Sequence, residues 1–373
     1  MPAIDTLIAE AEISEPRISE AMAGARHNME ICNACRYCEG FCAVFPAMQR
    51  HREFSATDLD HLANLCHGCQ GCFYACQYAP PHPWGINVPQ AFAVVRAESY
   101  AAHAWPKPMG RLFQRNGTVV SLVTALAVTL VLLLAGALQS SGTMLAPHTG
   151  PGAFFAVISY NAMVYTAAAT FLYALLAMSL ATASFWRASG GKIRPIHFAR
   201  ALHDAMTLRN LGGGGDGCNY PGESFSFTRR WLHHAMAYGF LLCFAATSVA
   251  TIFHHALGWV APYSLLSAPV LLGTIGGILM LIGTGGLLWL KILADPEPAA
   301  KAVLGGDYAM LILLALVAKT GLLLLLLRST GAMGWILALH LGFVLALFVA
   351  LPYSKLIHAL FRTAALARDH GER

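Results

Sequence analysis

Charged residues are scarce in this chain of 373 residues: Asp, Glu, Lys and Arg make up 12% of it, and hydrophobic residues make up 57%. An average soluble domain carries about 25% charged residues, so the composition excludes an ordinary soluble globular protein. The scarcity is uneven, because the segment before Thr118 reads as an ordinary polar segment and the long apolar runs begin there. The sequence therefore predicts two domains, a polar head and a membrane domain.

Several familiar signatures are also absent. Residues 1–31 contain acidic residues throughout and lack a charged-then-apolar start, so no secretory signal is predicted and the N-terminus is expected to stay on the side of synthesis. Paired carboxylates, a nucleophile with its base and a phosphate-binding glycine loop are missing, which argues against substrate chemistry within this chain. No dinucleotide fingerprint follows a strand, so the chain is not expected to hold its own flavin or nicotinamide in the usual way.

Six apolar runs are each long enough to cross the hydrocarbon core of a bilayer as a helix. They are approximately Thr118–Leu138, Ser159–Thr182, Leu232–Phe253, Leu265–Leu290, Tyr308–Leu327 and Trp335–Ile357. An even number of spans places both chain ends on one side of the membrane. The head and the first span meet near Trp105-Pro106-Lys107-Pro108, where two prolines interrupt any helix.

Basic residues in the connections predict the orientation, because Lys and Arg accumulate in cytoplasmic loops. The loops on the side of the termini hold Arg187, Lys192, Arg194, Arg200, Arg209, Arg229, Arg230, Lys291 and Lys301. The opposite loops offer only Arg328. We therefore expect both termini and the head to be cytoplasmic. The net charge of +5 is explained by these loops, so binding to nucleic acid is not expected.

Eight of the ten cysteines form two copies of one pattern, in which three cysteines at two-residue intervals are followed by a fourth after three residues. The copies are Cys32, Cys35, Cys38 and Cys42, and Cys66, Cys69, Cys72 and Cys76. Three such thiolates can bind one [4Fe–4S] cluster while the fourth points to a second cluster. We therefore predict crossed ligation of two clusters. One takes Cys32, Cys35, Cys38 and Cys76, and the other takes Cys66, Cys69, Cys72 and Cys42.

Two other interpretations of these cysteines are weaker. Structural zinc prefers separated cysteine pairs, and disulfides are disfavoured in a reducing cytosol. One departure from the bacterial ferredoxin pattern is that Ala43 and Gln77, rather than proline, follow the fourth cysteines. Cys243 in an apolar span is interpreted as a small buried hydrophobe. Cys218 follows a run of glycines, residues 212–217, whose simplest interpretation is a linker and whose alternative is a loop close to a cofactor.

Histidines at the ends of membrane spans are candidate haem ligands, because a polar side chain there is costly and usually has a partner. His340 and His358 lie 18 residues apart, which is five whole turns and about 27 Å along a continuous helix. The third span offers His233 and His234 at one end and His254 and His255 at the other. Depth then pairs His358 with His233 or His234, and His340 with His254 or His255. The alternative for each histidine is an interfacial side chain satisfied by water or a carbonyl.

Lys319 lies near the middle of the fifth span, where an uncompensated charge is costly. It is predicted either to pair with a haem propionate or line a quinone pocket, or to reach the membrane surface with its long side chain. Together these patterns predict an all-α protein. Its helical, ferredoxin-like head with two [4Fe–4S] clusters spans residues 1–105, and its six-helix, haem-binding transmembrane bundle spans residues 106–373.

Two resemblances to known families follow from these motifs. Residues 338–360, with His340 and with Leu351-Pro352-Tyr353-Ser354-Lys355-Leu356-Ile357-His358, are similar to the last helix of the cytochrome b subunit of respiratory nitrate reductase, where the matching histidines ligate two haems. Nearly the full chain resembles the tricarballylate/citrate-utilisation protein B family more closely. That resemblance rests on the double cysteine motif, Pro80-Pro81-His82 and residues 229–239 at the start of the third span.

The second resemblance implies a bacterial inner-membrane protein that accepts electrons from a partner FAD flavoprotein, a tricarballylate dehydrogenase, and passes them to the membrane quinone pool. It carries over the eight cluster cysteines. The resulting expectation is a relay from reduced flavin through two [4Fe–4S] clusters and two b-type haems to quinone. The alternatives are a subunit of a nitrate-reductase-like or heterodisulfide-reductase-like complex, which differs in its catalytic partner, and a membrane redox sensor.

Overall fold

The computed structural model describes residues 19–190 and 194–373. Lys192 of the predicted basic loop and the first eighteen residues, which include most of the segment searched for a secretory signal, lie outside the described residues. In the described part, helices account for all regular structure except two short paired strands, β1 (Cys218–Asn219) and β2 (Phe225–Ser226). The prediction of an all-α protein is confirmed.

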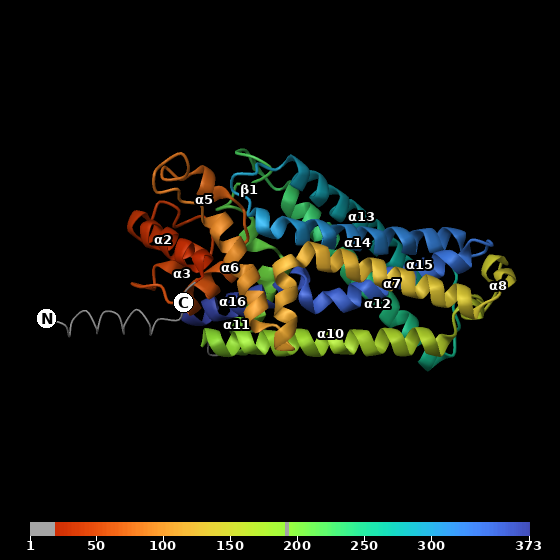
Figure 1. Cartoon of the computed structure of the whole chain (residues 1–373). Helices are drawn as coiled ribbons and strands as arrows, with labels where there is room; N and C mark the ends of the chain where they lie inside the picture. The colour runs from red at the N-terminus through yellow and green to blue at the C-terminus, as the bar shows by residue number, and fades with distance from the viewer. Residues whose placement is uncertain (1–18, 191–193) are drawn as a thin grey trace.

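The head forms one end of an elongated molecule, and the C-terminus lies at this end beside α2, the first described helix (Figure 1). Its helices are α2 (Glu20–Cys35), α3 (Val44–Met48), α4 (Ala56–Leu65), α5 (Gly71–Tyr74) and α6 (Val88–His103). Ser55 and Asp58 form a capping box that fixes the start of α4, and the Asn87 side chain caps α6. These caps define where the helices begin on either side of the second cysteine motif.

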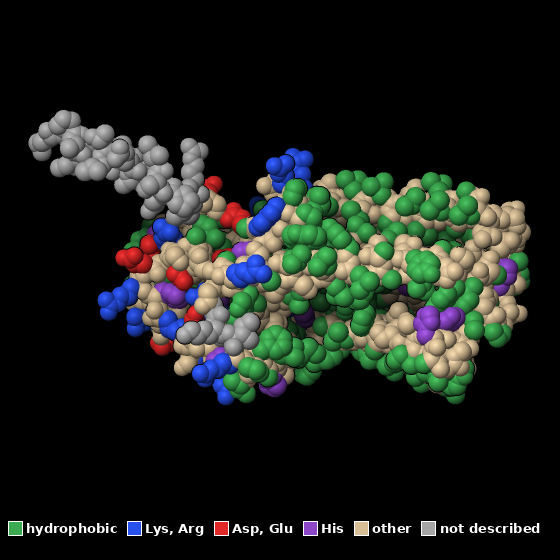
Figure 2. Space-filling view, turned by 90° about the horizontal axis from the view of Figure 1, so that it is seen from below, with side chains coloured by type: hydrophobic (Ala, Val, Ile, Leu, Met, Phe, Trp, Pro, Cys, Tyr) green, Lys and Arg blue, Asp and Glu red, His purple; other side chains and the backbone are tan. Residues whose placement is uncertain are grey.

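Six helices in the described part are long and apolar enough to cross a membrane. They are α7 (Asn116–Leu138), α10 (Tyr160–Ser189), α12 (Thr228–Leu257), α13 (Ala268–Leu293), α14 (Lys301–Leu327) and α15 (Met333–Ala350). Apolar side chains cover the surface of this bundle, whereas charged side chains gather at the head (Figure 2). Leucines such as Leu126, which is 70% exposed, belong in lipid rather than water. The prediction of six spans is confirmed.

Small residues bring two of these helices into close contact. A Cβ atom on Gly239 of α12 would lie 2.6 Å from the backbone nitrogen of Met280 on α13. Packing of this kind allows close van der Waals contact between helices in lipid, where the hydrophobic effect supplies no driving force. It fixes α12, and with it His233, against the rest of the bundle.

The shorter elements connect these helices. A 3₁₀ segment, η1 (Lys107–Arg115), joins the head to α7. The far end carries α8 (Ser141–Leu145) and α9 (Ala153–Val157), and the long loop before α12 carries α11 (Pro195–Met206) and η2 (Arg209–Leu211). After α15 the chain continues through η3 (Leu351–Tyr353) and η4 (Lys355–Ile357) into α16 (His358–Glu372).

The sixth predicted span was wrong at its C-terminal end. The α-helix ends at Ala350 and resumes only at His358, instead of continuing to Ile357. Pro352 has no N–H to donate and its ring clashes with the preceding turn, so it ends the helix. Consequently, His340 and His358 are not separated by five turns of one continuous helix, and that prediction does not apply.

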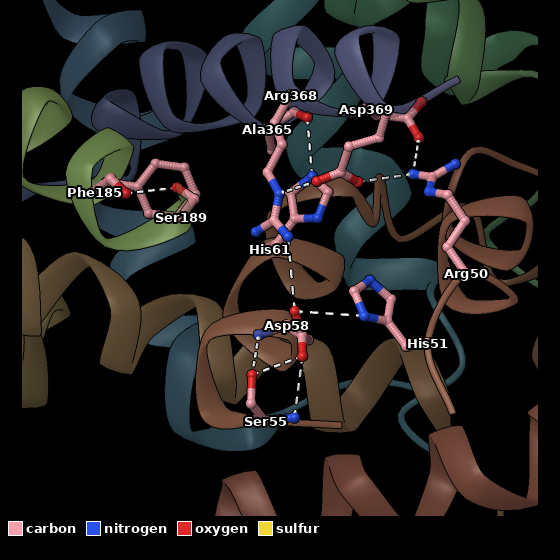
Figure 3. A network of polar contacts seen from close by, with 11 residues as sticks. Arg50, His51, Ser55, Asp58, His61, Phe185, Ser189, Ala365, Arg368 and Asp369 are labelled. Atoms are coloured by element: carbon pink, nitrogen blue, oxygen red, sulfur yellow. Dashed lines mark hydrogen bonds and ion pairs between the residues drawn. The ribbon is translucent and has the colours of Figure 1, made fainter. Parts of the chain in front are cut away.

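Helix α16 packs into the head rather than onto the membrane bundle. Phe361 and residues 364–367 share one hydrophobic core with α2, α4 and α6, and α10 contributes Phe185 to the same core. Polar contacts reinforce the packing (Figure 3). Arg50 pairs with the fully buried carboxylate of Asp369 at 2.6 Å, and His61 Nε2 lies 3.0 Å from the carbonyl oxygen of Ala365. Helix α16 thus builds the head together with α2, α4 and α6. The domain boundary at residue 105 stays a prediction.

Candidate functional site

The first predicted set of cluster cysteines converges on one cavity in the head. Cys32 and Cys35 lie on the last turn of α2, which ends when Arg36 adopts a left-handed conformation. The cavity has a volume of about 260 Å³. Its sulfur-bearing lining residues are Cys32, Cys35, Cys38, Cys72 and Cys76. Cys76 of the second motif thus shares this cavity with three cysteines of the first motif, and so does Cys72.

The second set also converges, around a much smaller space. Cys42, Cys66, Cys69 and Cys72 line a cavity of about 10 Å³. That volume is about what one water molecule needs. The thiols have the composition and arrangement of a four-cysteine site, but they would have to turn apart to admit a cluster.

No group of three or more His, Cys, Asp or Glu side chains among residues 19–190 and 194–373 converges on a single metal ion. A [4Fe–4S] cluster would space its ligands further apart than a single ion, because each thiolate binds a different iron atom.

Burial raises the pKa of the thiols of Cys32 and Cys38 to about 12, and neighbouring thiols raise the pKa further. Burial likewise raises the pKa of Cys42 and of Cys72 well above the ordinary value, followed by repulsion from Cys69. Four thiolates would not coexist here without compensating positive charge. Iron of a bound cluster would supply that charge, with release of the thiol protons.

Three arginines bind the backbone of the second motif. Arg96 Nη1 and Arg362 Nη2 donate to the carbonyl oxygen of Cys66 at 3.1 and 2.9 Å, respectively. Arg229 donates to the carbonyl oxygens of Gly68 and His67. These side chains come from the head, α16 and α12, so the motif is held by three distant segments. Positive charge beside a cluster is one of the factors that set its reduction potential.

The glycine-rich segment is not a free linker. It lies against the head, where Gly214 approaches the backbone of Gly40 and Phe41. The backbone N–H of Asn219 donates to the carbonyl oxygen of Cys69 at 3.0 Å. Gly217 has a φ of 107°, which only glycine adopts readily. The linker interpretation was therefore wrong, and the segment covers the second cysteine set.

Cys218 is fully buried in this cover, packed in one cluster with Cys69. Its Sγ lies 3.2 Å from the carbonyl oxygen of Leu211. Sequence reasoning found no partner thiol, because Cys69 is far away along the chain. The glycines before Cys218 were the only signal of its position.

His233 and His358 face each other where the bundle meets the head. Their ring centroids lie 6.2 Å apart and their planes are 88° apart. Two imidazoles on opposite sides of one iron place their centroids roughly 6 Å apart, since each metal–nitrogen bond is about 2 Å. The structure thus brings together one of the predicted histidine pairs, despite the break in the sixth span.

The ring nitrogens of this pair that make no hydrogen bond would be free to hold a haem. His358 Nδ1 lies 2.5 Å from the carbonyl oxygen of Lys355, an arrangement that fixes the tautomer and leaves Nε2 free. Burial holds the pKa of His358 well below its ordinary value, and Arg362 lowers it further, so the ring is neutral. His233 Nδ1 is buried and has no hydrogen-bond partner among the described residues.

The predicted outer pair is not brought together. His340 faces α14, where its Nδ1 lies 3.0 Å from Thr320 Oγ1. His254 instead stacks on Tyr160 with centroids 4.1 Å apart, and His255 Nε2 lies 2.7 Å from the Tyr160 hydroxyl. His340 thus contacts Thr320, and His254 and His255 contact Tyr160, rather than one another across the helices. These neighbours are hydroxyl-bearing side chains rather than the water or carbonyl of the interfacial alternative.

The last two candidates point elsewhere. His234 lies beside Trp231 and Tyr238, and its Nε2 is buried without a partner among the residues described. Lys319 is exposed on α14 and makes no hydrogen bond or ion pair to a described residue. Neither side chain faces the His233–His358 pair, so depth along a span did not predict which face a side chain occupies.

Residues 113–373 match the family model for citrate utilization protein B, and residues 25–102 match the model for the Fer4-like domain of that protein. The chain belongs to the citrate utilization protein B family. The Fer4-like match contains all eight motif cysteines, so the head of this family member is of the iron–sulfur type and suggests an electron-transfer role.

A curated relative agrees with this assignment. The citrate utilization protein B of Escherichia coli is 44% identical over 370 residues, which cover 99% of this chain and 96% of the relative. No solved structure matches. The resemblance inferred from the cysteine motifs is confirmed by a family member that matches along nearly its whole length.

Proposed function

We propose that this family member is the membrane subunit that carries electrons from a separate cytoplasmic FAD dehydrogenase, of the tricarballylate dehydrogenase type, to quinone in the bacterial inner membrane. Two [4Fe–4S] clusters and a b-type haem supply one-electron redox chemistry when bound. The observation that carries the proposal is the pair of crossed cysteine sets. Arg229 of α12 and Arg362 of α16, on the helices that carry His233 and His358, bind the backbone of the second motif.

The ligands proposed for the clusters are the two crossed sets. Cys32, Cys35, Cys38 and Cys76 would hold one cluster, and Cys66, Cys69, Cys72 and Cys42 the other. The cavity of about 260 Å³ and the buried, closely spaced thiols support this assignment. The three arginines bound to the second motif would raise the potential of its cluster, since positive charge favours the reduced form.

The ligands proposed for haem are His233 and His358. Their facing rings, the orphaned Nδ1 of His233 and the fixed tautomer of His358 support one haem at the head end of the bundle. A second haem at the far end, predicted from depth alone, has no such support, because among the described residues His340 forms no ring pair with His254 or His255 like that of His233 and His358. The proposal therefore carries one haem.

The proposed orientation follows from the basic residues in the loops, which are expected on the cytoplasmic side. The head then lies in the cytoplasm, and residues 106–373 lie in and around the membrane. The charged head end and the apolar bundle support this arrangement (Figure 2). The head then presents the first cysteine cavity to a soluble dehydrogenase. Tyr37 lines that cavity and is 70% exposed, so the cavity borders the molecular surface.

Metal analysis of the anaerobically purified protein tests the proposal. We expect about nine iron atoms per chain, eight with acid-labile sulfide and one in b-type haem, seen in the reduced-minus-oxidised spectrum. About ten irons and two haems would restore the second haem. Eight irons without haem would remove the histidines from the relay, and fewer than four irons would overturn the proposal.

The dehydrogenase partner requires a separate measurement. A flavoprotein that copurifies with the intact membrane protein, and whose substrate reduces its clusters, is the expected result. If a molybdenum or heterodisulfide enzyme reduces the clusters instead, the proposed partner is wrong, whereas the proposed cofactors still stand.

A further inference from the structure

A cavity of about 350 Å³ lies where the head rests on the membrane bundle. Its walls come from α6, from the connection between α13 and α14, and from the segment between η3 and α16. The cavity belongs neither to the cysteine sets nor to the histidine pair. Its size is within the range of small-molecule sites.

The polar groups of this cavity centre on one carboxylate. Asp307 receives Lys291 Nζ on Oδ2 at 2.7 Å and Lys355 Nζ on Oδ1 at 2.5 Å. The Asp307 side chain is only 9% exposed, so two cations hold a buried anion at the end of the bundle. Tyr308 donates its hydroxyl proton to the carbonyl oxygen of Lys291 at 3.2 Å. The wall therefore offers two ammonium donors, from α13 and η4, which converge on one carboxylate of α14.

The cavity borders both the lipid-facing surface and the redox residues. Ile292 lines it and is 67% exposed on α13, which gives a hydrophobic tail a way in from the bilayer. Gly68 and Gln70, the neighbours of Cys69, line the opposite side. Lys355, also in the wall, places its carbonyl oxygen against Nδ1 of His358.

We propose that this cavity is the quinone site of the protein. The inference rests on the proposed function and locates its acceptor. The ammonium groups of Lys291 and Lys355 hydrogen-bond the quinone carbonyl oxygens, and Ile292 contacts the start of the tail. Two electrons arrive one at a time from the cluster and haem side, and two protons enter from water at the head surface. The two C=O groups become C–OH groups, so quinone leaves as quinol with its charge balanced.

A second cavity, of about 400 Å³, is the rival site. It lies between α7, α10 and α15, and its lining is apolar except for Thr170, Tyr173 and Tyr353. The hydroxyls of Tyr173 and Tyr353 lie 2.8 Å apart, and Tyr353 also donates to the carbonyl oxygen of Trp105 at 3.0 Å. These hydroxyls already have partners within the protein. The cavity at Asp307 offers free donor capacity, since each ammonium has three N–H groups.

The test uses the full-length protein in detergent, reduced anaerobically with dithionite and then mixed with decylubiquinone. Cluster reoxidation is followed by absorbance. Lys291→Gln removes a charged donor, and Ala97→Phe fills the cavity from α6 without changing any charge. We expect each variant to raise the decylubiquinone concentration for half-maximal rate at least tenfold with unchanged iron and haem content. Lys301→Gln, an exposed control on the same connection, should stay within twofold.

A binding measurement accompanies the kinetics. A photoreactive azidoquinone should label peptides that contain residues 291–308, and Ala97→Phe should abolish the labelling. Labelling of residues 109–123 or 169–173 instead, or unchanged kinetics in both variants, would overturn this site while leaving quinone as the acceptor. Clusters in the unsubstituted protein that decylubiquinone fails to reoxidise would overturn the proposed acceptor itself.

Discussion

His233 on α12 and His358 on α16 are far apart in the sequence, yet their ring centroids lie 6.2 Å apart and their ring planes are nearly perpendicular. The pairing depends on two separate features. Small residues hold α12 tightly against α13, and the break at Pro352 lets the chain turn into α16 before His358 begins that helix.

Replacing His358 by Ala is expected to remove the haem, because one imidazole alone leaves an axial position open. His233→Ala should have the same effect, whereas the matched control His234→Ala should keep full haem content. The pyridine haemochrome assay on purified protein measures this directly. Full haem in either of the first two variants would contradict the ligand pair.

Cys42→Ser is expected to damage the cluster that the second motif holds, because crossed ligation places Cys42 in that set. Cys76→Ser should damage the other cluster. Electron paramagnetic resonance of the reduced protein separates the two signals, and Cys243→Ser in the bundle serves as the control. If Cys42→Ser alters only the cluster of the first motif, ligation within each motif is correct instead.

Gly217→Ala is expected to loosen the cover over the second cysteine set. The added Cβ would lie 2.6 Å from the backbone of Ser226, at a φ of 107° that alanine disfavours. A cost of about 1 kcal/mol or more follows from the conformation alone. Cluster absorbance should then decay several-fold faster in air. Gly222→Ala, where a Cβ meets nothing within 4 Å, should decay at the unsubstituted rate.

Asp369→Asn is expected to detach α16 from the head. Asp369 is fully buried, accepts a hydrogen bond from Arg50 and forms an ion pair with Arg373, so the substitution leaves both guanidinium groups with a weaker partner. Arg50 keeps some contact with solvent, so we expect a loss of roughly 1–3 kcal/mol rather than the full cost of breaking a buried pair. Limited proteolysis within α16 should accelerate. Glu372→Gln, on the exposed side of the same network, should change it little.

Acid is expected to destabilise the head partly through His61. Burial lowers the pKa of His61 to about 4 from an ordinary value of 6.5. The unfolded chain therefore binds a proton more readily, and stability that is present above pH 6.5 is lost as the pH falls toward 4. The contribution is up to roughly 3 kcal/mol. Thermal unfolding between pH 7 and 5 should show a shallower slope in His61→Gln, and parallel slopes would contradict this origin.

The sequence predicted the features that depend on local pattern. Length and hydropathy predicted six spans, and the cysteine motifs predicted a Fer4-like head, whereas the crossed ligation of the two cysteine sets stays a prediction. The histidine geometry was only half correct, because an 18-residue separation has meaning only on an unbroken helix and Pro352 ends that helix. The face of α14 on which Lys319 lies depends on packing between helices. The contacts of Tyr160 with His254 and His255 depend on it too. Neither could be predicted from the sequence of one span.

The arginines around Cys66 and the cover formed by residues 212–219 depend on contacts between segments far apart in the chain. A single sequence gives no distance information of that kind. The glycine run was visible as a motif, but its docking against Gly40 and Cys69 was not. The same limit hid the triad of Lys291, Asp307 and Lys355, whose members lie at the ends of three different elements.

The shared core of α16 and the head has a consequence for biosynthesis. Phe361 and residues 364–367 complete a core whose other members include α2, α4 and α6, which are made before the spans, and Phe185 of α10, the second span. While the ribosome is still inserting helices into the bilayer, the nascent head lacks one wall and the histidine that faces His233. The head can therefore close only after the last span is in place. Iron–sulfur assembly factors would meet an open, partly folded cysteine domain throughout translation, and maturation of the stable form would have to be post-translational.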